Sequence, residues 1–196
     1  MRIGLLAEDR TDADAVKVLI KRILGNHVSI KPKCGKGCAR LRAKARPHMR
    51  DLASEGYSTI IVLHDLDRNS DTNCLNDEST LEQELEGIET PKGVQRLICI
   101  PIEELEAWFW CDQHVLDEVG SGAHASQNPH NIARPKEKLQ WISRGANKKP
   151  RYSTNDNARL CEMLDLDLCA KKCTAFAKLR DFVIKCADQD EQGITN

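Results

Sequence analysis

The chain has 196 residues, of which 40% are hydrophobic and 30% are charged, and its formal net charge is −1. This composition is ordinary for a soluble globular protein that can bury a real core, and the near-zero charge does not select a partner. No stretch reaches transmembrane length and the N-terminal residues lack the pattern of a signal peptide, so we expect a cytoplasmic protein.

The cysteine pattern does not indicate a disulfide framework. Their number, nine, is odd, and several lie at apolar positions, which indicates reduced and mostly buried thiols. Two pairs, Cys34-x-x-x-Cys38 and Cys169-x-x-x-Cys173, have the look of zinc half-sites, although the sequence shows no obvious third and fourth ligand. Zinc binding by either pair is left open.

Strand and helix patterns alternate in the first half of the chain. Strands are predicted at residues 2–7, 28–30, 59–63 and 95–100. Helices are predicted between them at residues 13–24, 40–55 and 79–87. This alternation predicts βαβ units and an α/β fold with a mostly parallel sheet flanked by helices.

The second half of the chain shows helical patterns only. They fall at residues 104–119, 136–143, 155–164 and 174–187. We therefore predict an α/β domain over residues 1–112 and a helical C-terminal region over residues 113–196 that packs on it. Self-association of the chain is left open.

Carboxylates follow two of the predicted strands. Glu8 ends the first strand, and Asp65 and Asp67 end the run Ile60–Leu63, which is apolar enough for a strand buried on both faces. The carboxyl ends of parallel strands lie on one edge of a sheet, where ligands bind in open α/β folds. These three side chains are therefore predicted to converge.

Further acids are predicted at the same edge. Asp12 falls in the first turn of the following helix, and Glu103 and Glu104 follow the last strand. Any one of these acids alone is more often a cap or a solvated side chain, but their conjunction favours a site for one or two divalent cations. Oxygen ligands suit Mg²⁺ or Mn²⁺. His64 alternates to the other face of the strand and is predicted to pack in the core.

Basic residues gather in one segment of this nearly neutral chain. Between residues 31 and 50 every charged side chain is basic: Lys31, Lys33, Lys36, Arg40, Arg42, Lys44, Arg46 and Arg50. A smaller basic group comprises Lys148, Lys149 and Arg151, next to Tyr152, which could stack on a base. Both groups are candidates for binding a phosphate backbone, and solvated surface is the alternative.

The order strand, Glu8, turn, helix, followed by a strand ending in Asp65-x-Asp67, resembles the TOPRIM domain of type IA topoisomerases, primases and OLD-family nucleases. The resemblance covers about half the chain and implies metal-binding roles for Glu8, Asp65 and Asp67. Asp12 matches an acidic position of the OLD-like nucleases. The chain departs from the pattern at Asp9, where the family usually has glycine, and at Asn69, where a third acid is common.

Three further segments resemble a narrower group of small bacterial TOPRIM-like proteins that are often encoded beside ATPases in anti-phage defence loci. They are residues 101–108, 134–136 and 173–176. The resemblance implies a metal-dependent nuclease acting on DNA or RNA with an ATPase partner. A topoisomerase is excluded because the chain is too short for the separate domain that carries the tyrosine nucleophile. The alternative is a non-catalytic subunit that docks on an ATPase, with residues 169–176 as an exposed surface.

Overall fold

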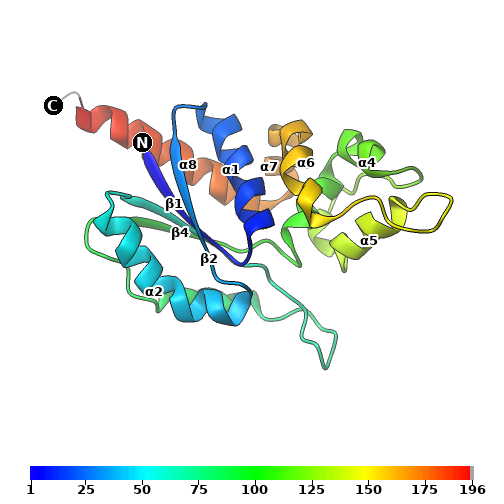
Figure 1. Ribbon diagram of the computed structural model, residues 1–196, viewed down its shortest axis with the longest axis horizontal. Coiled ribbons are helices and arrows are strands. Elements are labelled where there is room, and N and C mark those ends of the chain that lie inside the picture. The colour runs from blue at the N-terminus through cyan, green and yellow to red at the C-terminus, as the bar shows by residue number, and fades with distance from the viewer. Residues whose placement is uncertain (195–196) are drawn as a thin grey trace.

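The computed structural model describes the backbone of residues 1–194 and contains a four-stranded parallel sheet within that range (Figure 1). The strands are β1 (Arg2–Ala7), β2 (Ser29–Cys34), β3 (Thr59–Leu63) and β4 (Gln95–Cys99), in the order β2-β1-β3-β4. Every neighbouring pair is parallel. The predicted α/β fold with a parallel sheet is therefore confirmed.

The two central strands are buried on both faces. Side chains of β1 alternate, so that Ile3 and Leu5 enter one hydrophobic cluster while Leu6 enters another on the opposite face. On that second face a Cβ at Gly4 would lie 2.7 Å from Cδ1 of Leu52. Glycine at this position lets the covering helix approach the sheet closely.

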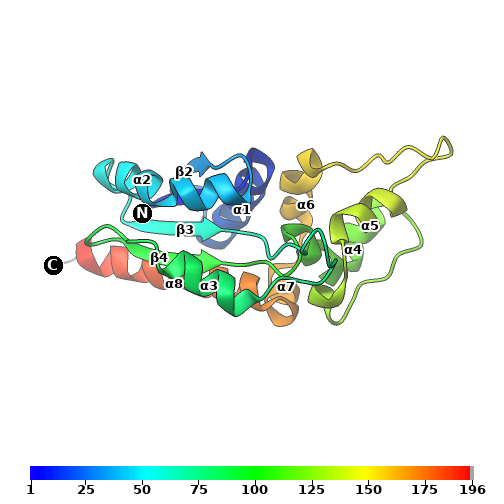
Figure 2. The ribbon, with the colours of Figure 1, turned by 90° about the horizontal axis from the view of Figure 1, so that it is seen from below.

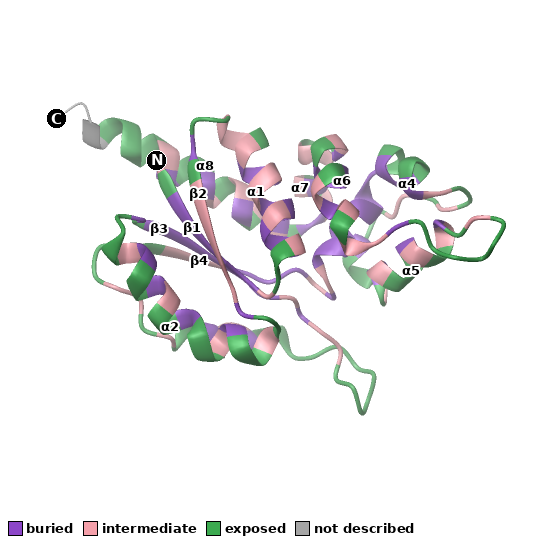
Figure 3. Cartoon of the chain, in the orientation of Figure 1, coloured by how far each residue is buried: buried purple, intermediate pink, exposed green. Residues whose placement is uncertain are grey.

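Helices cover both faces of the sheet (Figures 1 and 2). One face is covered by α1 (Arg10–Leu24) and the long α8 (Thr174–Ile194), which contact each other. The other face is covered by α2 (Cys38–Ser54) and α3 (Glu78–Glu86). The central strands β1 and β3 are consequently almost entirely buried, whereas the edge strands β2 and β4 are mostly half-buried (Figure 3).

The remaining helices are short and lie past the carboxyl end of the sheet. They are η1 (Leu105–Cys111), α4 (Gln113–Val119), η2 (Pro129–Asn131), α5 (Pro135–Ile142), η3 (Thr154–Asp156), α6 (Asn157–Met163) and α7 (Leu166–Lys172). Of these, α6 packs extensively on α1, so the core of the sheet continues into the C-terminal region. None of the helices within the described residues has the length and apolarity needed to span a membrane.

The prediction of one helix over residues 104–119 was wrong. The segment is a 3₁₀ helix, η1, followed by α4, and the two are separated by Asp112 in an extended conformation. The Asp112 side chain caps α4 by accepting from the His114 backbone N–H at 2.9 Å, and it also accepts from that of Asp165 at 2.8 Å. These bonds favour a break over a continuous helix.

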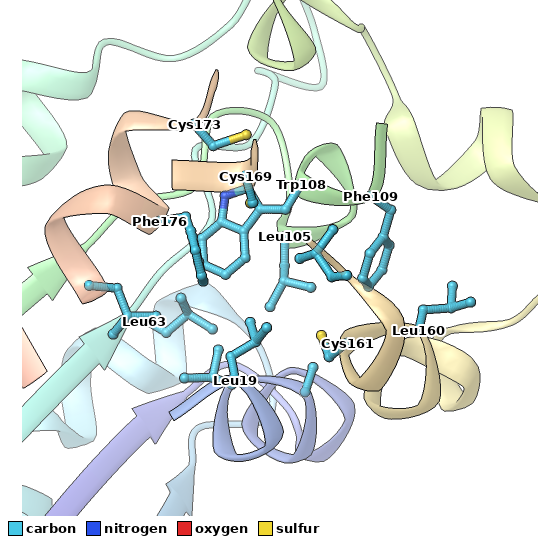
Figure 4. Packing of buried hydrophobic residues seen from close by; sticks show 14 of the residues in the cluster. Leu19, Leu63, Leu105, Trp108, Phe109, Leu160, Cys161, Cys169, Cys173 and Phe176 are labelled. Atoms are coloured by element: carbon cyan, nitrogen blue, oxygen red, sulfur yellow. The ribbon is translucent and has the colours of Figure 1, made fainter. Parts of the chain in front are cut away.

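The segment of residues 169–176, predicted to be exposed, is largely part of the core. Cys169 and Phe176 are fully buried and Cys173 is 6% exposed. Phe176 packs edge-on against Trp108 with ring centroids 5.3 Å apart (Figure 4). The cysteines and the phenylalanine of this segment are therefore core residues, and its exposed side chains are those of Lys171 and Thr174.

Candidate functional site

The site is organised around Glu8, the first residue after β1. The loop after β2 is hydrogen-bonded to the Glu8 backbone: the backbone N–H groups of Lys36 and Gly37 donate to the Glu8 carbonyl at 2.8 and 3.2 Å. Gly35 lies against the backbone of Leu41, where a Cβ would come within 2.5 Å. The loop thus holds the start of α2 beside the end of β1.

This arrangement places Cys38 between two carboxylates. Its Sγ lies 2.9 Å from Glu8 Oε2 and 2.9 Å from Asp67 Oδ2. Burial and these two hydrogen bonds raise the pKa of the Cys38 thiol well above its ordinary value. Cys38 therefore keeps its proton and lies between the Glu8 and Asp67 carboxylates, donating its single S–H to one of them at a time.

A metal-binding geometry is present at this point. Glu8, Cys38 and His64 each offer one ligand atom, and the three atoms lie within 4.8 Å of one another. The His64 ring is already engaged, however, with Nε2 3.1 Å from Arg42 Nη1 and Nδ1 2.8 Å from the Asp65 carbonyl. Because arginine only donates, Nε2 accepts and Nδ1 carries the proton, which favours the predicted packing role over metal ligation.

Asp65 is the least satisfied group in the site. Within the part of the chain that the structure describes, its Oδ1 is the one buried side-chain oxygen or nitrogen without a hydrogen-bond partner. Burial raises the pKa of Asp65 well above its usual range, and neighbouring negative charges raise it further. Those charges belong to Asp12, Glu106, Glu8 and Asp67.

Asp12 faces the same point from the first turn of α1. It is 8% exposed, and burial together with the carboxylates of Asp9, Glu106 and Glu8 raises its pKa to about 8, while Lys136 opposes the shift. Asp9 itself is the N-cap of α1, since its Oδ1 accepts from the backbone N–H groups of Thr11 and Asp12. Asp9 therefore has a structural role.

Glu106 is a site residue that the sequence did not single out. It is 3% exposed in η1, and its Oε1 accepts from Asn157 Nδ2 at 3.0 Å and lies 3.3 Å from Tyr152 Oη. Tyr152 is 5% exposed and also donates to Asn157 Oδ1 at 2.6 Å. The prediction that Tyr152 could stack on a base was therefore wrong.

Removing the Asn157 amide is expected to destabilise the protein. Asn157→Ala leaves the buried Glu106 without its closest donor and Tyr152 without its closest acceptor, and we expect a loss of about 1–3 kcal/mol in the free energy of unfolding. Urea denaturation measures this loss. Asn155→Ala, on the exposed surface of the neighbouring 3₁₀ turn, is the control and should change it by less than about 0.5 kcal/mol. Equal effects of the two substitutions would refute this role for Asn157.

Two predicted metal ligands lie beside the cluster and pair with cations instead. Glu103, 4% exposed, forms an ion pair with Arg68, and Lys136 Nζ lies 2.5 Å from Glu104 Oε1. Glu103 also has a positive φ of 66°, an uncommon conformation that turns its side chain toward Arg68. Of the six predicted ligands, the structure brings four together: Glu8, Asp12, Asp65 and Asp67.

Asn69, where a third acid was considered, does not add an oxygen to the cluster. Its Oδ1 accepts from the backbone N–H groups of Asp71 and Thr72 at 2.9 and 3.0 Å. This is a local turn at the start of an exposed loop. The further acid near Asp65 is Glu106, which comes from a different element and raises the pKa of Asp65.

Two clefts meet at Asp67. One, of about 480 Å³, is lined by Cys38, Asp65 and Arg42, and the other, of about 330 Å³, is lined by Glu104 and Arg134. Arg68 and Asn69 line both. The carboxylate cluster is therefore open to solvent at Asp67 and has guanidinium groups on either side.

The predicted basic segment occupies β2 and α2. Lys31 and Lys33 pair with Glu55 and Asp51, and Arg46 and Arg50 pair with Glu89. Lys36, Arg40 and Lys44 are exposed, and no ion pair is found for them within residues 1–192. The free part of this surface thus lies on α2 and the loop before it, near the mouth of the site.

The second basic group lies on a projecting loop at the far end of the molecule from the chain termini (Figures 1 and 2). Lys148 and Lys149 are exposed at its tip, whereas Arg151 is anchored, with Nε donating to the Ser143 carbonyl at 3.1 Å. The two lysine side chains are therefore less constrained than that of Arg151, which is exposed but held at its Nε.

Comparison with known proteins gives a single result. Neither the curated proteins nor the solved structures contain a match to the chain. The family described as "Domain of unknown function (DUF4276)" matches residues 7–184, which include every carboxylate of the cluster. The chain therefore belongs to the DUF4276 family.

Proposed function

We propose that the protein is a metal-dependent nuclease that hydrolyses phosphodiester bonds of DNA or RNA. The observation that carries the proposal is the unpartnered buried Oδ1 of Asp65 among four other carboxylates at the carboxyl edge of a parallel sheet. Such a concentration of negative charge is unfavourable without a neutralising group, and perturbed carboxylates in a cleft are typical of functional sites. A divalent cation is the group that fits.

The donor set favours Mg²⁺ or Mn²⁺. Glu8, Asp65 and Asp67 would supply the oxygens to such an ion, with Asp12 nearby, and hard oxygen donors suit these two metals. Cys38 keeps its proton and orients Glu8 and Asp67, so it does not impose a soft ligand. When bound, such an ion polarises a scissile phosphate and lowers the pKa of an attacking water.

The surroundings of the cluster suit a polyanionic substrate. Arg42 lines one cleft and Arg134 the other, and Arg68 lies between them. The exposed cations of α2 extend this surface away from the site. A nucleic-acid strand that passes over Asp67 would have its phosphates next to cations on both sides of the carboxylates. Such contacts between phosphates and basic side chains bind nucleic acid without sequence specificity.

Within the chain, Glu8 is the group best placed to accept a proton from water. Its Oε1 is held by the Asp65 backbone N–H at 3.3 Å and lies 3.5 Å from His64 Nδ1, while its Oε2 faces Cys38. These contacts fix the carboxylate in one orientation, which a general base requires. Arg42 and Arg68 would hold the phosphate in place as charge develops on it.

The decisive test is cleavage by the purified protein of labelled single- and double-stranded DNA and RNA, with Mn²⁺, with Mg²⁺ or with a chelator. The protein is assayed alone and with an ATPase encoded beside its gene, because the proposal includes a role with such a partner in anti-phage defence. We expect cleavage only with metal, and its loss in Asp67→Asn but not in Asp71→Asn, an exposed acid of the neighbouring loop. Absence of cleavage under every condition would refute the proposal.

A further inference from the structure

One large aromatic side chain, Trp141, lies outside the hydrophobic core. It belongs to the last turn of α5 and is 64% exposed, whereas Trp108 and Trp110 are 2% and 7% exposed. Among the large hydrophobic side chains that the structure describes, it is the most exposed. An indole offers a large flat face, and tryptophan is enriched where proteins contact other molecules. Trp141 is therefore a candidate contact residue.

The charged residues that follow Trp141 have one sign. Between residues 138 and 155 every charged side chain is basic: Lys138, Arg144, Lys148, Lys149 and Arg151. The first four are exposed, and no ion pair is found for them within the part of the chain that the structure describes. Arg151 instead lines a cleft together with Asp117 and Glu118. Trp141 and the four exposed cations are called the α5 surface below.

The loop after α5 has a fixed base. The Arg151 backbone N–H donates to Ser143 Oγ and its Nε donates to the Ser143 carbonyl, both at 3.1 Å. Within the loop the Lys148 backbone N–H donates to the Gly145 carbonyl at 2.9 Å, and that of Gly145 donates to the Lys149 carbonyl at 3.3 Å. The loop thus doubles back on itself beyond the end of α5 (Figures 1 and 2), with its two lysines at the tip.

Helix α5 connects this surface to the carboxylate site. Arg134, the residue before α5, and Glu137, in its first turn, line the cleft that contains Asp67. Glu137 and Trp141 are four residues apart, so they lie on the same face of the helix and about 6 Å apart along its axis. A strand that leaves the cleft along α5 would therefore reach Trp141 one helical turn later, and the cations of the loop after that.

We propose that the α5 surface binds single-stranded DNA or RNA, with Trp141 stacked on an unpaired base and the four cations next to the phosphates. The inference rests on the proposed function, because the strand that it holds is the substrate of the carboxylate site. An aromatic face beside cations is the usual means of binding a single strand without sequence preference. The bases of a duplex are stacked on one another, so the surface selects an unpaired strand.

Stacking is tested by fluorescence anisotropy of a short labelled oligonucleotide, in chelator so that nothing is cleaved. Trp141→Ala should weaken binding of the single strand by about 5- to 150-fold, and binding of the duplex by less than about twofold. Trp141→Phe, which keeps an aromatic face, should bind more tightly than Trp141→Leu. Ile184→Ala, at a 41% exposed position of α8, is the control. Because both positions are exposed, all four variants should keep the unfolding temperature of the wild type.

The cations are tested by the dependence of affinity on salt. Replacing Lys148 and Lys149 together by Gln should reduce the slope of log affinity against log salt concentration by about 1.4, at about 0.7 for each phosphate contact in a single strand. Trp141→Ala should leave this slope unchanged, since stacking releases no counterions. The control replaces Lys171 and Lys185, two exposed lysines of α7 and α8, by Gln.

Equal affinity of the wild type and Trp141→Ala for the single strand would overturn the proposal, and so would an equal loss for single strand and duplex. Self-association that Trp141→Ala abolishes, with oligonucleotide binding unchanged, would overturn it in favour of a contact between copies of the chain. Single-strand binding that depends on Trp141, in a protein that cleaves nothing with any metal, would support the α5 surface and refute the nuclease. Cleavage by a protein whose strand binding is independent of Trp141 would do the reverse.

Discussion

Asp65→Asn is expected to abolish metal-dependent cleavage and at the same time to stabilise the metal-free protein. The substitution removes a buried carboxylate that has no partner for Oδ1 and is surrounded by other acids. The amide can instead donate to a neighbouring carboxylate. We expect activity to fall by about 10³-fold, since the metal contributes several kcal/mol to the transition state, and the free energy of unfolding to rise by about 1–3 kcal/mol.

Opposite changes in activity and stability distinguish this residue from a structural one. Urea denaturation without metal measures the gain in the free energy of unfolding, and a cleavage assay measures the loss of activity. Mn²⁺ should raise the unfolding temperature of the wild type but not that of Asp65→Asn, because the variant lacks a ligand. Asp188→Asn, on the exposed surface of α8, should match the wild type in all three measurements. Destabilisation by Asp65→Asn in the absence of metal would contradict a metal role for Asp65.

The stability of the metal-free protein is expected to fall as the pH rises from about 4 to about 8. One cause is Asp12, whose pKa rises from 3.8 to about 8 on folding because the group is buried next to Asp9, Glu106 and Glu8, and the raised pKa of Asp65 acts in the same direction. Over this range the folded state binds a proton that the unfolded state has lost. The free energy of unfolding therefore decreases with pH, by about 1.4 kcal/mol per pH unit for one such group.

Asp12→Asn should weaken this dependence, leaving the part due to Asp65, and saturating Mn²⁺ should reverse it, because metal binding requires the ionised carboxylates that high pH supplies. Thermal unfolding at a series of pH values, with and without Mn²⁺, measures both effects. Asp14→Asn in the same helix is the control, since Asp14 is only half-buried and pairs with Arg10. If the stability of Asp12→Asn varied with pH as steeply as that of the wild type, the folded protein would not hold Asp12 in its protonated form.

Much of the fold could be predicted because its strands are buried and its helices amphipathic. The apolar runs at residues 2–7 and 59–63 have the pattern of central parallel strands, and they are β1 and β3. The short α7, at Leu166–Lys172, was not predicted, and residues 104–119 were taken as one helix. In both places side chains that cap or anchor from elsewhere in the chain, such as Asp112, determine the local structure.

The candidate site was predictable where its residues follow a strand and not where they depend on tertiary contacts. Glu8, Asp65 and Asp67 converge because parallel strands end on one edge. Glu106 was missed because three acids stand close together at residues 103–106, and the turn into η1 determines which of them points inward. Cys38 was considered only as half of a zinc pair, since the bonds that hold its loop against Glu8 have no sequence signature.

The parallel order β2-β1-β3-β4 also has a kinetic consequence. The proposed ligands follow two different strands, β1 and β3, and the Asp65 backbone joins the Glu8 side chain across 57 positions of sequence. Such long-range closure is slow compared with helix formation, so the mutually repelling acids meet only late in folding. Early folding states should therefore be insensitive to divalent ions, and an added ion should slow unfolding more than it accelerates refolding.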